Sequence, residues 1–337
     1  MRLLHVTALI ALLLGVPTKA GAQSAAHASL PVAAVGNFSG LVDIGDGRRL
    51  YLECAGQGGP TVVLEAGFRT RADLWSEDLI QPEAPRTMVF PGVATFTRVC
   101  AYDRPGTTTV VEDALLPSRS DPVAMPRTAA KSVHDLHALL EAAGVPGPYV
   151  LVGHSYGGML TRLYTSTYPD EVVGMVLVDA FSEGLKAQMT AEQWTAYAEI
   201  FQPVPEALAG YPDLEFTNLD LSVSQVRDAT DALPLPPCPQ SPGVPFPLVV
   251  LSRGRPMTMP ADLPGGLTGE GLERAWTIEQ ERLAALVPGA RHVIARESEH
   301  YIQLQQPELV IDAVRQVVDA VRDVSSRAMF TASTPNP

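Results

Sequence analysis

The sequence predicts an α/β fold with a mostly parallel sheet flanked by helices. Short apolar runs alternate along the chain with stretches whose apolar residues recur at helical spacing, which is typical of strand–helix–strand units. Several runs are continuously apolar, as expected for strands that helices cover on both faces. A chain of 337 residues leaves room for one large domain with insertions or for two small ones, and we expect one.

The individual elements follow from local patterns. Residues 129–143 carry apolar side chains at helical spacing and stop at Gly144, and a last helix begins with Pro307 and carries a stripe of valines. Residues 106–127 lack periodicity, and we expect disorder after Ser325. The runs predicted to be strands are 49–53, 61–65, 97–102, 149–153, 174–179, 246–252 and 291–295.

Residues 1–22 have the pattern of a secretory signal peptide. Arg2 precedes an apolar run over residues 3–16, and Ala20 and Ala22 form an A-x-A cleavage pattern. The run is shorter than a helix that crosses a bilayer, although an uncleaved N-terminal anchor is the alternative. We therefore expect cleavage after Ala22, secretion or export to the periplasm, and no stable membrane insertion.

Charge and composition narrow the range of partners. A net charge of −13, with 46% hydrophobic and 18% charged residues, is typical of an acidic globular protein. Nucleic acids and anionic membranes are poor partners for such a chain, because like charges repel. In a compartment that permits disulfides, Cys54, Cys100 and Cys238 predict one pair and one odd thiol. The sequence does not determine the oligomeric state.

The segment LVGHSYGG at residues 151–158 contains the candidate catalytic nucleophile. It continues a buried strand and leads into a helix that we expect to end near residue 168. In this context the GxSxG pattern is typical of a serine nucleophile on a turn so sharp that glycine is needed at Gly153 and Gly157. Because Ser155 precedes a helix, the positive end of the helix dipole lies near a developing oxyanion. We predict that Ser155 is a nucleophile.

These residues resemble the α/β-hydrolase family, from about residue 41 to residue 321. The resemblance is carried in order by LEAGF, AYDRPG, LVGHSYGG, LVDA and SEHYIQLQQPELV. It implies an α/β-hydrolase fold over residues 23–337, with a mostly parallel sheet flanked by helices, and it leaves the substrate undetermined.

The family order of nucleophile, acid and base implies that the base follows Ser155. Of the later histidines, His292 lies inside an expected strand, whereas His300 stands before the last helix, at a position that resembles the family's catalytic histidine. The acid that orients it remains open between Asp179 and Asp262. The strand that usually precedes this acid ends in LSRGRP without a carboxylate, so we favour Asp179, which ends a strand.

Two backbone amides are expected to form the oxyanion hole. One belongs to Tyr156, directly after the nucleophile, and the other to Phe68. The turn AGF at residues 66–68 resembles the HG-type turn of the family but has alanine where histidine is common. A plain glycine turn is the alternative.

Two further contacts are expected. The usual strand order of the family makes the strands that end near Cys54 and Cys100 neighbours, so a cross-strand disulfide is expected, which would leave Cys238 free. Asp103 and Arg104 end a strand near the nucleophile and are expected to brace its turn through charged hydrogen bonds.

Residues 180–245 are too long for a plain loop between two strands. They contain Trp194, Tyr197, Ile200 and Phe201 and end in a proline-rich run. We expect a cap insertion over the active site whose aromatic residues shape an apolar pocket. A packing decoration that touches no substrate fits the sequence equally well.

The resulting expectation is a secreted serine hydrolase that cleaves a small-molecule carboxylic ester through an acyl-enzyme intermediate. No cofactor is required for this chemistry, and the sequence has no metal-binding spacing. A serine at this turn argues against dehalogenases and epoxide hydrolases, which use a carboxylate there. Peptidase, lactonase, thioesterase and perhydrolase activities share the constellation, and a binding protein without catalysis on this scaffold is the alternative from another class.

Overall fold

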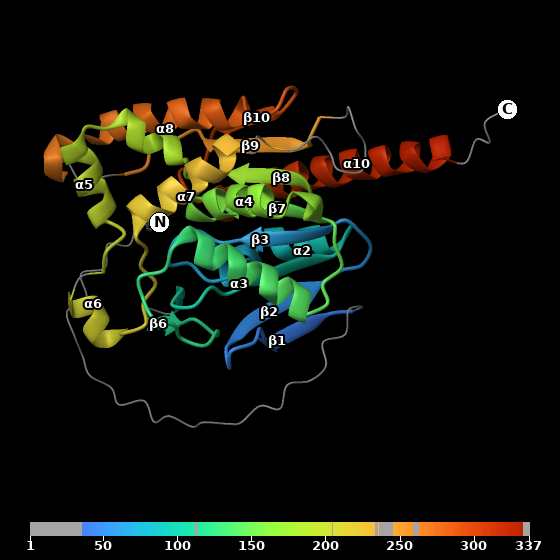
Figure 1. Ribbon diagram of the computed structural model, residues 1–337, viewed down its shortest axis with the longest axis horizontal. Helices are drawn as coiled ribbons and strands as arrows, with labels where there is room; N and C mark the ends of the chain where they lie inside the picture. Colours follow the sequence, from blue (N-terminus) through green and yellow to red (C-terminus); the bar gives the residue numbers. More distant parts are fainter. Residues whose placement is uncertain are drawn as a thin grey trace.

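A computed structural model describes residues 36–111, 114–203, 205–232, 235, 245–258 and 263–332. Its centre is an eight-stranded sheet in the order β1-β2-β4-β3-β7-β8-β9-β10 (Figure 1). Strand β2 pairs antiparallel with β1 and β4, and all other neighbours are parallel. The strands are β1 Phe38–Asp43, β2 Arg49–Ala55, β3 Thr61–Glu65, β4 Val99–Tyr102, β7 Tyr149–His154, β8 Val172–Val178, β9 Leu248–Arg253 and β10 Arg291–Ala295.

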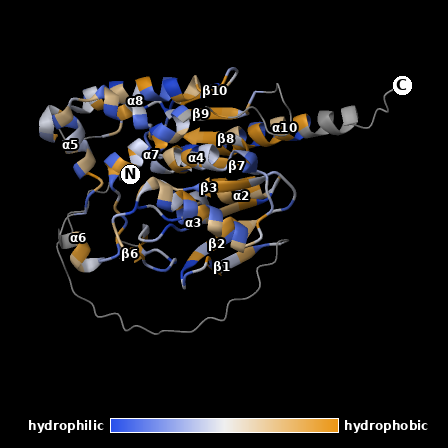
Figure 2. Cartoon of the chain, viewed as in Figure 1, coloured by the Kyte–Doolittle hydropathy of each residue, from blue (hydrophilic) through white to orange (hydrophobic). Residues whose placement is uncertain are grey.

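Helices cover both faces of this sheet. Alternate residues of a strand point to opposite faces, so Leu151 joins the core under α3, α4, α7 and α8, whereas Val150 and Val152 join the core under α2 and α10. Figure 2 shows the hydrophobic colour concentrated on the central strands. The helices are α1 Asp73–Ser76, α2 Val89–Ala94, α3 Ala129–Ala142, α4 Tyr156–Thr167, α5 Ala191–Glu199, α6 Pro205–Gly210, α7 Leu219–Ala232, α8 Gly269–Ala284, α9 Ile302–Gln305 and α10 Pro307–Ala332, with 3-10 turns at Pro169–Glu171, Glu183–Gln188 and Pro264–Gly266.

The predicted α/β fold with its mostly parallel, helix-flanked sheet is confirmed, and three local predictions were wrong. Strand β1 was missed because it is a partly exposed edge strand without a continuous apolar run. A small antiparallel hairpin, β5 Thr108–Val111 and β6 Ala114–Pro117, lies inside residues 106–127, where no strand was expected, because its side chains are mostly exposed. Helix α10 continues to Ala332, beyond the point where disorder was expected.

The predicted disulfide is confirmed. Cys54 on β2 lies directly opposite Cys100 on β4, with 4.1 Å between their Cα atoms and 2.07 Å between the sulfur atoms. Both residues are buried. Cys238, predicted to be the free thiol, lies outside the described residues.

The described parts of residues 180–245 are largely helical. They contain α5, α6 and α7, and Figure 1 shows α5 and α6 at one end of the sheet, opposite the end from which α10 projects. Trp194, Tyr197 and Phe201 are buried, and the ring of Phe201 lies 4.7 Å from that of Phe68. This segment therefore packs against the loop after β3. No described helix is long and apolar enough to cross a membrane, and residues 1–22 lie outside the described ranges.

Candidate active site

Ser155 stands on the sharp turn between β7 and α4. Its φ of 51° and ψ of −123° are unfavourable for a residue other than glycine. The backbone around it holds this conformation, because the Ser155 amide donates to Val178 O at 3.1 Å and its carbonyl accepts from the Gly158 and Phe181 amides at 2.9 Å. Ser155 is partly exposed in this turn, between a buried strand and a buried helix.

The glycines of this turn are required by close approach of backbone. A Cβ at Gly153 would lie 2.6 Å from Gly157 O, and a Cβ at Gly157 would lie 2.5 Å from Ala66 O. The second contact brings the turn against the loop after β3. A Cβ at Gly67 would likewise lie 3.4 Å from the Ser155 Cβ, so this loop runs directly beside Ser155.

Asp179 follows β8 and lies against His300. His300 Nδ1 donates to Asp179 Oδ2 at 2.6 Å, and the carboxylate is fully buried. Its other oxygen accepts from Trp276 Nε1 at 3.0 Å. Of the two candidate acids, Asp179 is thus in contact with His300, and Asp262 lies outside the described residues.

Arg253 is an additional partner of this carboxylate, and the sequence analysis assigned it no role. It ends β9, and its Nη1 donates to Asp179 Oδ2 at 2.6 Å while its side chain also pairs with Glu273 on α8. Burial alone would raise the pKa of Asp179, but the charge of Arg253 and the hydrogen bond from His300 hold that pKa below its ordinary value. The sequence signal for this contact was Arg253 itself, which stands in LSRGRP at the strand end where the family usually has its acid.

His154 supports the loop that carries His300. Its Nε2 donates to the His300 carbonyl at 3.0 Å, and the two rings lie 4.7 Å apart. Burial and the neighbouring charge of His300 lower the pKa of His154 to about 3, so this ring stays neutral at ordinary pH. A Cβ at Gly67 would approach His154 Nδ1 to 2.8 Å, so His154 also packs behind the loop after β3.

The two amides predicted to form an oxyanion hole lie on neighbouring segments. Tyr156 begins α4, so its amide has no partner within the helix, and Phe68 lies in the loop after β3. Within the described ranges neither amide donates a hydrogen bond. The two rings pack edge to face at 5.9 Å, which keeps the segments together. Both amides are therefore unpaired in the described part of the chain, on two segments that lie against each other.

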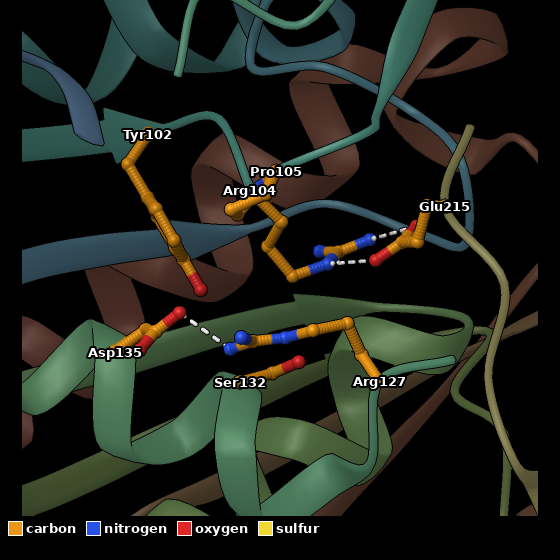
Figure 3. Close-up of a pocket in the computed structure, with 7 residues that line it drawn as sticks. All are labelled: Tyr102, Arg104, Pro105, Arg127, Ser132, Asp135 and Glu215. Atoms are coloured by element: carbon orange, nitrogen blue, oxygen red, sulfur yellow. Dashed lines mark hydrogen bonds and ion pairs between the residues drawn. The ribbon is translucent and has the colours of Figure 1, made fainter. Parts of the chain in front are cut away.

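A buried charged cluster lies behind the loop after β3 (Figure 3). Arg104 donates to the Ala66 and Gly67 carbonyls and pairs with both Glu65 and Glu215. The charged hydrogen bonds of Arg104 thus go to the neighbouring loop after β3 and not, as was predicted, to the nucleophile turn, and the contact with that turn is the guanidinium 5.8 Å from the ring of Tyr156.

Asp103 differs from the prediction in the same way. It accepts hydrogen bonds from the Ala72 amide and from Arg119, and none of these groups belongs to the turn that carries Ser155. The reason is strand order, because β4 adjoins β3 and is separated from β7 by it.

A family model described as the alpha/beta hydrolase family matches residues 62–313. The chain belongs to this family. No group of three or more histidine, cysteine, aspartate or glutamate side chains among the described residues could hold a metal ion.

Individual relatives are distant or partial. A probable transporter, efuK, from Hormonema carpetanum is 30% identical over 181 residues, which cover 51% of this chain and 23% of that protein. Matches to two further curated relatives cover 41% and 26% of their lengths, so the chain spans less than half of these proteins. An AB hydrolase superfamily protein from Gibberella zeae is 24% identical over 309 residues, 78% of this chain and 87% of that protein.

A solved structure of a thermophilic esterase from Thermogutta terrifontis superposes with a TM-score of 0.51 and 19% identity. The match covers 86% of this chain and 100% of the esterase chain. At this identity the likeness concerns the fold.

Proposed function

We propose that the protein is a serine hydrolase that cleaves small-molecule carboxylic esters. The observation that carries the proposal is the hydrogen bond from His300 to the buried Asp179, together with the strained turn at Ser155, whose preceding residue, His154, contacts His300. A base oriented by a buried acid next to a serine hydroxyl is the arrangement that activates serine for acyl transfer.

The reaction follows from these groups. Ser155 Oγ attacks the ester carbonyl while His300 Nε2 takes its proton, and the Phe68 and Tyr156 amides stabilise the oxyanion. The tetrahedral intermediate collapses as the protonated His300 gives that proton to the departing alcohol, which leaves an acyl group on Ser155. Water then attacks the acyl group with His300 again as base, and the acid product leaves. Asp179 holds the His300 ring and stabilises its cation throughout.

Residues 180–245 are proposed to be a cap that contributes an apolar wall. The ring of Phe181 in this segment contacts the rings of Tyr197 and Phe201. It also contacts Trp276 on α8, whose ring lies 5.6 Å from that of His300. Aromatic walls bind apolar acyl or alcohol groups. We also propose export through cleavage of residues 1–22, which the buried disulfide supports because such bonds persist in oxidising compartments.

A fluorophosphonate probe tests the nucleophile. The native protein should be labelled on Ser155, and Ser155→Ala should abolish the labelling. Ser252→Ala is the matched control, because Ser252 Oγ also contacts a histidine, at 2.7 Å from His292 Nε2, but lies inside β9 and not on a strained turn. Labelling that persists in Ser155→Ala, or disappears in folded Ser252→Ala, contradicts the assignment.

The substrate class is tested with p-nitrophenyl esters of increasing acyl length, beside a lactone and a thioester. Hydrolysis of the esters with an optimum at one chain length supports the proposal. If only the lactone or the thioester is hydrolysed, the proposed catalytic residues stand and the proposed substrate class is replaced by that one.

A further inference from the structure

The orientation of the Phe68 amide depends on its peptide bond with Gly67. In a trans peptide the carbonyl and the N–H point to opposite sides, and this bond is trans because the cis bonds of the described chain all precede proline. Arg104 Nη2 donates to the Gly67 carbonyl at 2.5 Å, and Nη1 donates to the Ala66 carbonyl at 2.8 Å. The Thr70 amide and hydroxyl donate to the same oxygen, at 3.3 Å and 2.9 Å. By holding the Gly67 oxygen together with Thr70, Arg104 keeps the Phe68 N–H on the opposite side of this peptide bond.

Glu215 holds the next peptide bond. Its Oε2 accepts from the Arg69 amide at 2.6 Å, and its own carbonyl accepts from Arg69 Nε at 2.8 Å. Arg69 has a φ of 59°, a conformation that a residue other than glycine keeps only when its surroundings hold it. Phe68 is therefore fixed from both sides, by Arg104 through the preceding peptide bond and by Glu215 through the following one.

The same two residues are joined to each other. Arg104 Nε donates to Glu215 Oε1 at 2.7 Å and Nη2 donates to Oε2 at 3.1 Å (Figure 3). Glu65 pairs with Nη1. The Arg104 side chain is 3% exposed, so water screens this pairing weakly. A planar fork with several donors can serve two carboxylates and two carbonyls at once, which a lysine cannot do.

Glu215 belongs to the 180–245 segment. It lies between α6 and α7, and its amide donates to the Gly106 carbonyl at 2.8 Å, which ties the segment to the loop after β4. The segment thus reaches past the aromatic wall and contacts the backbone that presents Phe68.

We propose that Arg104 and Glu215 are positioning residues for the oxyanion hole, and that the inserted segment supplies Glu215 to complete it. The proposal rests on the proposed serine hydrolase function. It means that the insertion contributes to transition-state stabilisation through the Phe68 amide, in addition to any contact with substrate.

The test compares Glu215→Gln with Asp135→Asn. Glutamine keeps the size of the side chain and removes the charge that pairs with Arg104. Asp135 is the matched control, because it is a buried carboxylate in the same region of Figure 3 whose partners, Arg127 and Arg48, do not contact residues 66–69. For each variant, kcat and KM are measured on the best p-nitrophenyl ester, with the denaturation midpoint and the rate of fluorophosphonate labelling.

Loss of one oxyanion donor lowers kcat by a factor of about 10²–10³, and a displaced donor should lose part of that. Glu215→Gln is therefore expected to lower kcat and the labelling rate by about 10–100-fold with little change in KM. Asp135→Asn is expected to lower the denaturation midpoint and to change kcat less than about 3-fold.

An unchanged kcat in Glu215→Gln, or an equal loss of kcat in Asp135→Asn, overturns the proposal. If Glu215→Gln does not fold, Glu215→Asp replaces it, since aspartate keeps the charge and is one methylene too short; a several-fold loss of kcat supports the proposal and native kcat overturns it. A native protein that the probe does not label counts against the proposed function instead, so the two failures are distinguishable.

Discussion

Replacing Arg253 by methionine is expected to move the acidic limb of the pH profile of kcat/KM to higher pH. Asp179 must be ionised to orient His300. The Arg253 cation holds the pKa of this buried carboxyl below its ordinary value, against the burial that would raise it. Removing the cation raises the pKa of Asp179, so the carboxylate is protonated and activity is lost at a higher pH as the solution is acidified.

The magnitude follows from the geometry. Arg253 Nη1 lies 2.6 Å from Asp179 Oδ2, and both side chains are buried, so solvent screens the pair weakly. Two unit charges about 4 Å apart attract by about 4 kcal/mol at an effective dielectric constant of about 20. Because methionine also leaves the carboxyl in a buried site, we expect the limb to move by at least about one pH unit, which corresponds to about 1.4 kcal/mol.

The other neighbours of Asp179 do not reverse this sign. Trp276 carries no charge, and the hydrogen bond from His300 favours the ionised carboxylate with or without Arg253. Glu273 lies on the far side of Arg253, and its negative charge disfavours the ionised Asp179 more strongly once Arg253 is gone. Its effect adds to the expected rise.

The assay is kcat/KM for a p-nitrophenyl ester between pH 4 and pH 8. It is restricted to folded protein, because Arg253→Met leaves the buried Asp179 less well paired and should lower the free energy of unfolding by about 3–5 kcal/mol. Arg253→Lys keeps the charge and should retain the native midpoint. Arg255→Met removes a charge from an exposed position two residues further on and controls for net charge. A midpoint in Arg253→Met that is unchanged or lower refutes the reasoning.

Three further predictions concern the same site and its support. Asp179→Asn should lower kcat by about 10³–10⁴-fold with little change in KM, because His300 loses the acceptor that orients it; steady-state kinetics on the folded variant test this. Reducing the bond between Cys54 and Cys100 should lower the free energy of unfolding by about 2–5 kcal/mol, measured by denaturation with and without reductant. Gly157→Ala should destabilise the fold by about 1–3 kcal/mol and reduce kcat, because its Cβ would press on Ala66 O and displace the loop that carries the Phe68 amide; native unfolding and turnover in this variant would contradict the crowding argument.

The features that sequence could predict are those with local causes. The buried strands appear as apolar runs, since helices cover both faces of the sheet. The turn at Ser155 appears as a glycine pattern, since a Cβ at Gly153 would lie only 2.6 Å from the backbone of the turn. Strand β1 and the β5–β6 hairpin escaped prediction because they are partly exposed and lack such runs.

The contacts that complete the candidate site are not local. Asp179 and His300 are separated by 121 residues, and Arg69 and Glu215 by 146. Whether such side chains meet depends on strand order and on the path of the inserted segment, and no short sequence pattern records either. The only sequence hint to the role of Arg253 was that an arginine stands at a strand end where the family usually has its acid. No sequence pattern indicated a role for Glu215.

The sequence by itself determined the α/β class, the family resemblance, and the candidacy of Ser155 and His300. The apolar runs and the glycine turn have local causes, and His300 follows from the order of motifs along the chain that the resemblance implies. Only the tertiary structure decided that Asp179 contacts His300, that Arg253 shares this carboxylate, and that Arg104 braces the loop after β3 together with Glu215. The physical reason is that burial of charge requires partners, and the fold alone selects which distant residues become those partners.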